Sequence, residues 1–514
     1  MMHLQDTMVL ILGLGSSGLA MARWCARSGA RVTVSDTRTN PPQRARLAED
    51  CPDAGFICAI PDAALLAQVQ PALVLKSPGL SPAQIAPLLD AAREAGIAVW
   101  GELDLFAQAL ADLQAADGYA PDVLAITGTN GKTTVASLTA QLMDRAGKTV
   151  ALAGNIGPTL LDTLTERLAQ QSLPQAWVIE LSSFQLADMA APALAGDTQG
   201  ATAFEPTAAC VLNLSQDHLD WHGDMAAYAL AKSRVFGSQA LMVLNRDEPQ
   251  VMAMLPAPVK GRAVRRSTTV GGGLPMQPGE FGLEQVHGMT WLVRAQELDP
   301  TIKIRKGQAA EALFMQRLMP AEALRIRGRH NAVNALTALA LAAGTGCALA
   351  PLLYGLREYR GEPHRVESVG ILNEVEFFDD SKGTNVGATV AALAGLGAER
   401  RLVAILGGDG KGQDFTPLAE PIAQVARAVV LIGRDAPQIR AALASTGVTL
   451  LDASGMADAV TLAMREARSG DAVLLSPACA SFDMFDNYGH RAQVFIEAVQ
   501  AMALDAGAEL QGGA

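Results

Sequence analysis

The stretch that decides the fold is residues 123–134, Val-Leu-Ala-Ile-Thr-Gly-Thr-Asn-Gly-Lys-Thr-Thr. It reads as a strand, a glycine-rich loop and the start of a helix, which is the arrangement of a phosphate-binding loop. The glycines expose backbone amides to phosphate oxygens, Lys132 can reach the β- and γ-phosphates, and Thr133 offers a hydroxyl to Mg²⁺. Ile126 stands where the usual pattern has its first glycine, so the loop is a shortened variant. We expect it to bind a nucleoside triphosphate.

Apolar strands alternate with helical segments on both sides of this loop, which indicates parallel sheets. Strands are predicted at residues 9–13, 31–35, 72–76, 97–100, 177–181, 209–214, 240–244, 374–378, 402–407, 428–433 and 472–476. The length of 514 residues suits an α/β fold of three domains. We expect a Rossmann-like N-terminal domain (1–105), a P-loop-type central ATPase domain (106–360) and a Rossmann-like C-terminal domain (361–514). Glycines, prolines and short alternating segments predict an insertion of β-rich structure or loops at about 256–308.

The composition narrows the class of protein. A net charge of −12 disfavours a general nucleic-acid binder, and the six cysteines are scattered without metal-binding spacing. The N-terminus lacks a signal-peptide layout. Residues 330–356 carry no Lys, Arg, Asp or Glu, but their asparagines, glycines and proline favour two buried helices over a membrane span. We expect a cytoplasmic protein, monomeric, with reduced thiols.

A second glycine turn, Gly13-Leu14-Gly15-Ser16-Ser17-Gly18, follows the first predicted strand and opens a helix. Asp36 stands at the end of the next strand, as in a dinucleotide-binding fingerprint. The pattern recognises a pyrophosphate and a ribose, so on its own it cannot separate NAD from other nucleotide diphosphates. A tight turn without a ligand is the third reading.

Two more side chains follow strands of the central domain. Glu180 ends a predicted strand, so its carboxylate is expected at the carboxyl edge of the sheet, where it could bind Mg²⁺ together with Thr133. His218 comes just after another strand, which makes it a second candidate ligand. Taken alone, Lys232 reads as an ordinary lysine on a helix surface.

Together these residues resemble the Mur ligase family, the ATP-dependent amide ligases of peptidoglycan precursor synthesis. Further along, His330-Asn331-x-x-Asn334, His364-Arg365-Val366-Glu367 and residues 379–385 resemble the family's adenine-side, inter-domain arginine and ribose-binding motifs. Residues 180–186, 407–412 and 476–483 resemble the branch of the family that adds D-glutamate.

The resemblance implies a role for each matching residue. Uridine diphosphate is expected to contact Gly13, Leu14, Gly15, Ser16, Ser17, Asp36, Thr37, Arg38, Ser77, Pro78 and Gly79. ATP is expected to contact Gly128, Thr129, Asn130, Gly131, Lys132, Thr133, Thr134, Asn155, Asn331, Asn334, Arg365 and Asp380. D-glutamate is expected to contact Lys382, Thr384, Lys411, Ser481 and Tyr488. The implied magnesium ligands are Thr133, Glu180, His218 and Lys232.

The implied reaction joins D-glutamate to UDP-N-acetylmuramoyl-L-alanine through an acyl phosphate, with ATP and two Mg²⁺ ions. In this family the lysine that matches Lys232 is carbamylated, which turns an ammonium group into an anion able to bind Mg²⁺. The residues expected to be catalytic are Lys132, His218, Lys232, Lys382 and Arg365.

Three other readings stay open at this point. One is a different amide ligase with the same phosphate loop, such as a folylpolyglutamate synthetase. Another is an NAD-dependent oxidoreductase, which rests on the first glycine turn alone. The third is a nucleotide-binding switch protein without catalytic activity.

Overall fold

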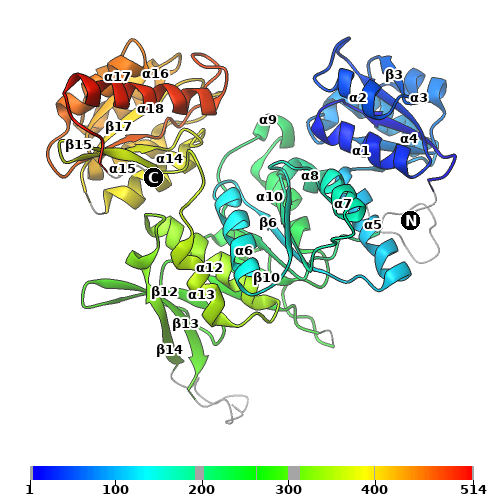
Figure 1. Ribbon diagram of the computed structural model, residues 1–514, viewed down its shortest axis with the longest axis horizontal. Coiled ribbons are helices and arrows are strands. Elements are labelled where there is room, and N and C mark those ends of the chain that lie inside the picture. The colour runs from blue at the N-terminus through cyan, green and yellow to red at the C-terminus, as the bar shows by residue number, and fades with distance from the viewer. Residues whose placement is uncertain (1–3, 191–201, 262, 299–312, 399, 512–514) are drawn as a thin grey trace. The chain divides into compact units, whose positions relative to one another are not determined.

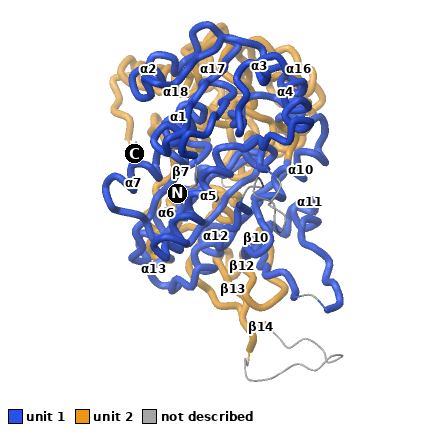
Figure 2. Tube along the Cα trace, turned by 90° about the vertical axis from the view of Figure 1, so that its right-hand side faces the viewer, with its two compact units in different colours: residues 1–214, 218–270, 337–352 blue, residues 215–217, 271–336, 353–514 orange. Residues whose placement is uncertain are grey.

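The computed structural model describes residues 4–190, 202–261, 263–298, 313–398 and 400–511. The chain forms two compact units, which Figure 2 colours separately. Unit 1 comprises Met1–Leu214, His218–Val270 and Thr337–Leu352, and unit 2 comprises Ser215–Asp217, Gly271–Leu336 and Leu353–Ala514. In the described part of the chain, no helix has the length and apolar character needed to cross a membrane. The predicted α/β class is confirmed.

Unit 1 begins with an all-parallel sheet of five strands in the order β3-β2-β1-β4-β5 (Figure 1). Its strands are β1 (Met8–Leu12), β2 (Arg31–Asp36), β3 (Gly55–Cys58), β4 (Leu73–Lys76) and β5 (Ala98–Trp100). The helices between them are α1 (Ser16–Arg27), α2 (Arg44–Asp50), α3 (Ala63–Val69) and α4 (Pro82–Glu94). Because β2 and β4 flank β1, the strand order reverses there, and ligands bind at such switch points.

The central sheet is also parallel, with six strands in the order β11-β10-β9-β6-β8-β7. Its strands are β6 (Asp122–Thr127), β7 (Val150–Gly154), β8 (Ala176–Glu180), β9 (Ala208–Val211), β10 (Leu241–Asn245) and β11 (Ser267–Val270). The accompanying helices are α6 (Lys132–Arg145), α7 (Leu160–Ala169), α8 (Ser183–Ala187), α9 (Leu219–His222), α10 (Met225–Ser233) and α11 (Pro249–Met252). The uncharged segment predicted as two helices forms α12 (Arg329–Gly344) and α13 (Leu349–Glu358).

The two sheets of unit 1 share one hydrophobic core. Helix α5 (Glu102–Asp117) connects them, and its Phe106 packs edge-on against Trp177 of β8 with ring centroids 5.0 Å apart. The same apolar cluster contains Val9 of the first sheet and Leu160 of α7. Arg23 of α1 also donates to the Asp162 carboxylate of α7 at 3.1 Å.

Unit 2 contains a small antiparallel sheet in the order β12-β13-β14. Its strands are β12 (Phe281–Val286), β13 (Met289–Glu297) and β14 (Leu313–Pro320). The predicted insertion at 256–308 covers β12 and β13 and also β11, which pairs with β10 as part of the central sheet. Residue 262 and residues 299–308 of that range lie outside the described residues.

The last sheet of unit 2 has the order β15-β16-β20-β17-β18-β19 and is parallel except for the antiparallel pair β15–β16. Its strands are β15 (Glu367–Leu372), β16 (Val375–Asp379), β17 (Leu402–Gly407), β18 (Ala426–Ile432), β19 (Thr449–Asp452) and β20 (Ala472–Leu475). The helices are α14 (Val386–Gly397), α15 (Ala419–Val425), α16 (Ala436–Leu443), α17 (Met456–Glu466) and α18 (Tyr488–Asp505). Apolar clusters cover both faces of this sheet.

Candidate functional site

The first glycine turn is held by close backbone packing. Gly13 has a positive φ of 85°, and its carbonyl accepts a hydrogen bond from the Ser77 hydroxyl at 3.0 Å. A Cβ atom on Gly18 would lie 2.0 Å from the Gly13 carbonyl oxygen, so only glycine allows α1 to approach the turn. Gly15 is the N-cap of α1 and Ser16 its first residue. The structure thus brings the turn next to Ser77, which begins the predicted Ser77-Pro78-Gly79 contact.

Asp36 lies at the end of β2 beside this turn. Its carboxylate accepts the Leu14 backbone N–H at 2.8 Å and a two-pronged contact from the Arg38 guanidinium, with both distances 2.8 Å. The Arg38 contact is the main reason that the pKa of Asp36 falls to about 2. Arg38 and Thr37 are exposed. The arrangement presents a buried anion and an exposed cation at the switch point, suited to a ligand with both hydrogen-bond donors and phosphates.

The phosphate-binding loop occupies the carboxyl end of β6. Gly128 and Gly131 have positive φ values of 156° and 82°, which expose the loop amides, and α6 starts at Lys132. The Lys132 ammonium donates to the carbonyls of Gly128 and Thr129, both at 2.9 Å. Asn213, which follows β9, accepts from the Asn130 N–H at 2.8 Å and donates to its carbonyl at 3.1 Å. These two hydrogen bonds fix the conformation of the loop at Asn130.

Glu180, at the end of β8, binds two other predicted residues. One carboxylate oxygen accepts from the Thr133 hydroxyl at 2.9 Å, and the other accepts from the Asn155 amide at 2.8 Å. Glu180 is only 1% exposed. A carboxylate and a hydroxyl oxygen side by side form the hard oxygen donor set that Mg²⁺ prefers, so these residues fit the ion.

His218 and Lys232 lie on the segments that follow β9. His218 has a positive φ of 54°, and its ring meets the Phe184 ring with centroids 4.6 Å apart. Lys232 is 1% exposed, and its ammonium donates to the Gly128 carbonyl at 2.8 Å and the Thr127 hydroxyl at 3.3 Å. Lys232 therefore contacts the phosphate loop, which corrects the reading of an ordinary surface lysine.

The aromatic surroundings of these residues were not predicted. Tyr228 precedes Lys232 by one helical turn, and its hydroxyl hydrogen-bonds the Thr129 hydroxyl at 3.0 Å. His222 bonds the Ser183 hydroxyl at 2.9 Å, and burial lowers the pKa of His222 to about 4. Tyr228 stands four residues before Lys232, so both lie on the same face of α10. This spacing could have indicated that Tyr228 also faces the site.

Two further predicted ATP contacts, Asn331 and Asn334, lie in unit 2 on the first turns of α12. The Asn331 side chain donates to the Arg327 carbonyl at 2.8 Å, and Asn334 donates to the Asn331 side-chain oxygen at 3.0 Å. The two amides thus form a connected pair on one helix face.

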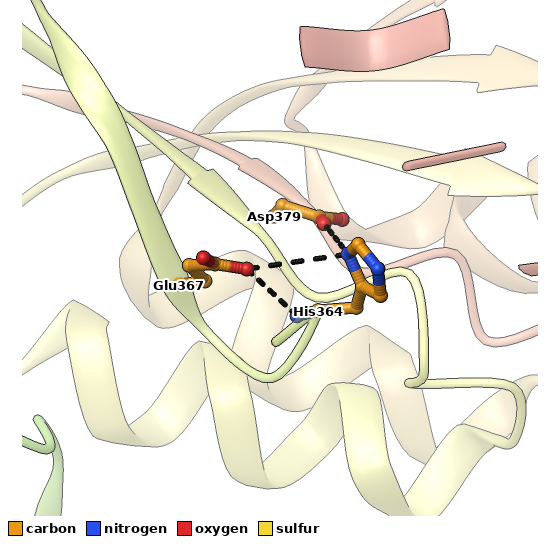
Figure 3. Close-up of side chains that lie close together, drawn as sticks. All are labelled: His364, Glu367 and Asp379. Carbon is orange, nitrogen blue, oxygen red and sulfur yellow. Dashed lines mark hydrogen bonds and ion pairs between the residues drawn. The ribbon is translucent and has the colours of Figure 1, made fainter. Parts of the chain in front are cut away.

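The turn His364-Arg365-Val366-Glu367 is fastened to the end of β16 (Figure 3). His364 Nδ1 lies 2.7 Å from the Asp379 carboxylate, and the His364 backbone N–H donates to Glu367 Oε2 at 2.8 Å. His364 and Val366 both have positive φ values, 63° and 51°, which non-glycine residues adopt only when contacts hold them there. The ligand-type atoms of the three labelled residues lie within 4.8 Å of one another, and these contacts set the backbone around Arg365.

Asp380 follows at the end of the same strand. The Ser476 hydroxyl donates to its carboxylate at 2.6 Å, and burial raises the pKa of Asp380 to about 7. The Gly383 N–H donates to the Asp380 carbonyl at 2.7 Å, so the predicted ribose-binding segment turns sharply after the strand.

Four of the residues predicted to contact D-glutamate lie on loops that follow strands of this sheet, and the fifth, Tyr488, begins α18. The Lys382 ammonium lies 3.8 Å from the ring centroid of Tyr488, the first residue of α18. The loops that carry Lys411 and Ser481 are joined by a β-bridge between Asp409 and Ala480. Ser481 is buried and Lys411 is exposed, and Thr384 follows Lys382 in the same loop. The loops after β16, β17 and β20 therefore place cationic and hydroxyl residues at the same edge of the sheet.

One buried ion pair was also missed by sequence reasoning. Lys76, the last residue of β4, pairs with Asp188, the C-cap residue of α8. Neither residue belongs to a recognisable motif, so no pattern in the sequence could have indicated the contact.

Three family models match the chain in order. Residues 7–101 match the Mur ligase MurD-like N-terminal domain, residues 126–270 the Mur ligase middle domain, and residues 364–479 the Mur ligase glutamate ligase domain. The chain is 65% identical over 515 residues to a UDP-N-acetylmuramoylalanine--D-glutamate ligase of Albidiferax ferrireducens, covering 99% of both chains. It is 55% identical over 517 residues to the ligase of the same name from Ralstonia nicotianae, again covering 99% of both.

Solved structures show the same fold at low identity. The UDP-N-acetylmuramate-alanine ligase MurC of Thermotoga maritima matches 97% of this chain and 100% of its own, with a TM-score of 0.53 and 18% identity. MurF of Acinetobacter baumannii matches 96% of this chain and 92% of its own, with a TM-score of 0.55 and 15% identity.

Proposed function

The chain belongs to the Mur ligase family, and from that premise we propose that it joins D-glutamate to UDP-N-acetylmuramoyl-L-alanine while consuming ATP. The observation that carries the proposal is the hydrogen-bonded set of Thr133, Glu180 and Asn155 beside the phosphate loop. That set gives the loop an anionic oxygen donor where a triphosphate and its magnesium would lie. The folate, oxidoreductase and switch-protein readings lack support from relatives of this identity.

The first chemical step joins two anions, so charge repulsion is its main obstacle. An oxygen of the alanine carboxylate attacks the γ-phosphorus of ATP, the bond to the β-phosphate oxygen breaks, and ADP leaves. Lys132 is held at the phosphate loop by two carbonyl contacts, and Arg365 is the second cation assigned to the transferred phosphate. The proposed contacts of Asn331, Asn334 and Asp380 hold the adenosine.

The second step is attack on the acyl phosphate by the amine of D-glutamate. The tetrahedral intermediate loses phosphate, an amide bond forms, and the amine gives up a proton. D-glutamate carries two carboxylates, which suit the Lys382 and Lys411 ammonium groups and the hydroxyls of Thr384 and Ser481. Tyr488 forms one wall of this subsite, since its ring lies against Lys382.

Magnesium supplies positive charge that offsets the repulsion between the two anionic substrates. Thr133, Glu180 and His218 are the residues that would hold it, with two ions expected. Lys232 supports this arrangement if its amine adds CO₂ and releases a proton, because the resulting carbamate is an anion. The buried position of Lys232 against the phosphate loop suits that modification. Incorporation of ¹³C-labelled bicarbonate, read as a carbamate resonance absent from Lys232→Met, would test it.

We assign one ligand to each of three domains. Residues 1–105 bind the UDP moiety, residues 106–360 bind ATP and residues 361–514 bind D-glutamate. The UDP moiety is assigned to the turn of Gly13 to Ser17, to Asp36, Thr37 and Arg38, and to Ser77 to Gly79. A monomer in the cytoplasm, where ATP and UDP-linked precursors occur, is the proposed setting.

The test is phosphate release from ATP with Mg²⁺ and UDP-N-acetylmuramoyl-L-alanine, with D- and L-glutamate supplied separately. Release that requires both the UDP substrate and the D isomer supports the proposal. Release with a different amino acid keeps the ligase reaction but contradicts D-glutamate as the amino-acid substrate. Absence of release with every amino acid refutes the ligase assignment.

A further inference from the structure

Lys76 occupies an unusual place for a lysine. It ends β4, directly before the Ser77-Pro78-Gly79 turn assigned to the UDP moiety, and its side chain is only 4% exposed. Its ammonium forms an ion pair with the Asp188 carboxylate, which is 9% exposed, and lies 5.2 Å from the centre of the Trp221 ring. One buried cation therefore contacts two separate segments of the proposed central domain, residues 106–360.

Both of those segments carry proposed magnesium ligands. Asp188 caps α8, which begins three residues after Glu180. Trp221 belongs to α9, whose N-cap residue is His218. Lys76 is thus connected to the UDP-binding turn by the peptide chain and to both metal-ligand segments by its side chain.

The surroundings show that the pair is built into the fold. Asp104 of α5 accepts the backbone N–H groups of Gly101 at 2.8 Å and Ala190 at 3.1 Å, and the Arg234 guanidinium donates to the Ala187 carbonyl at 2.9 Å. These contacts fix the chain on both sides of Asp188. Burial lowers the pKa of Lys76 and raises that of Asp188 to about 6, so the site tolerates these charges only as partners.

Stability alone does not explain such a pair. A buried ion pair commonly gains little over apolar residues of the same volume, because removing two charges from water is costly. Its best-attested use is to fix one geometry among several. One oxygen of Asp188 and the Trp221 indole N–H have no hydrogen-bond partner within the described residues, so the site is not optimised for stability.

We propose that Lys76 is a positioning residue that sets the distance between the UDP-binding turn and the magnesium-ligand segments. This inference rests on the proposed function. A fixed distance lets the alanine carboxylate reach the γ-phosphate when the pyrophosphate is anchored at the turn, and it selects substrates of the matching length. Misplacing reacting groups by about 1 Å can lower a rate by about 100-fold, so the pair is expected to act on turnover more than on binding.

The experiment compares wild type with Lys76→Met and with Lys76→Met combined with Asp188→Leu, which removes the pair without leaving a lone charge. The matched control is Lys148→Met, which breaks an ion pair with Asp122 at 3.2 Å that is partly exposed in the same unit. We expect kcat with UDP-N-acetylmuramoyl-L-alanine to fall by about 10- to 100-fold in the double variant. The Kd of UDP, the KM of ATP and the thermal midpoint should stay within about 2-fold or a few degrees of the control. A double variant with kcat within about 2-fold of wild type overturns the proposal. The proposal is also overturned if the fall in kcat comes with weaker UDP binding, a higher KM for ATP and a lower thermal midpoint, because the pair would then act on stability in general.

A second measurement needs no turnover. UDP-N-acetylmuramoyl-L-alanine is titrated alone while tryptophan fluorescence is followed, with Trp221→Phe identifying the contribution of Trp221. We expect a Trp221 response in wild type and in Lys148→Met, and its loss in Lys76→Met at unchanged UDP affinity. An equal response in Lys76→Met contradicts the coupling. If wild type releases no phosphate, the proposed ligase activity is refuted. The fluorescence result still tests the positioning role of Lys76 separately.

Discussion

The carboxyl group of Glu102 gives the protein a specific pH dependence of stability. Glu102 is the first residue of α5 and is 3% exposed, and one oxygen accepts the Leu161 backbone N–H at 3.2 Å. Burial raises its pKa from 4.5 to about 7, and a hydrogen bond from Ser17 opposes that rise. Glu102 therefore joins the connecting helix to α7 and to a residue of the first glycine turn.

The direction of the pH dependence of stability follows from the pKa of Glu102 in the unfolded chain and in the folded protein. An unfolded chain releases the Glu102 proton near pH 4.5, whereas the folded protein holds it to about pH 7. The contribution to stability is therefore complete below pH 4.5 and is lost as the pH rises through 7. A shift of roughly 2.5 units at about 1.4 kcal/mol per unit amounts to about 3 kcal/mol.

Glu102→Gln keeps a neutral side chain and the acceptor oxygen, so it should not show this loss. We expect the variant to be more stable than wild type at pH 8 by about 3 kcal/mol, with little difference near pH 4.5. The assay is urea denaturation of both proteins at several pH values, followed by circular dichroism. A difference that stays constant from pH 4.5 to pH 8 would refute the assigned protonation of Glu102.

Three further predictions concern the turns and the phosphate site. Lys132→Ala should lower turnover by about 100-fold or more while the circular dichroism spectrum stays unchanged, and normal turnover would defeat the phosphate assignment. Glu180→Gln can still accept from Asn155, so its thermal midpoint should change little while the Mg²⁺ concentration for half-maximal activity rises by about 10-fold or more. An unchanged Mg²⁺ requirement would remove Glu180 from the ligand set. Gly18→Ala places a Cβ 2.0 Å from the Gly13 carbonyl and should destabilise the protein by about 1–3 kcal/mol and weaken UDP binding in calorimetry. Wild-type UDP affinity in that variant would contradict the assigned turn.

Much of the fold could be predicted because buried parallel strands leave a strong apolar signal. Every predicted strand corresponds to an observed one, and residues 402–407 match β17 without a shift. The strands that escaped prediction include the edge strands β3 and β19, which have four residues each and exposed ends. An edge strand has a neighbouring strand on one side only, so fewer of its residues are buried. Its run of apolar residues is therefore short and hard to recognise in the sequence.

The candidate site was predictable where a motif carries the chemistry and not where burial decides it. The two glycine turns and the carboxylate of Glu180 could be read from strand ends. Lys232 could be assigned only through the family resemblance, because helix spacing alone does not show that its side chain reaches the Gly128 carbonyl. The Lys76–Asp188 pair spans 112 residues of sequence, and only the tertiary fold of unit 1 brings the two side chains together.

The core shared by both sheets of unit 1 limits how the protein can be recombined with its relatives. A chimera cut at the predicted boundary near residue 105 would divide α5, so that Phe106 stays with Trp177 but packs against strands of the first sheet from another protein. The Arg23–Asp162 and Glu102–Leu161 contacts would also have to be matched across the junction. An exchangeable cassette built on the first sheet therefore has to carry α5 and α7 with it, although α7 belongs to the segment that matches the Mur ligase middle domain.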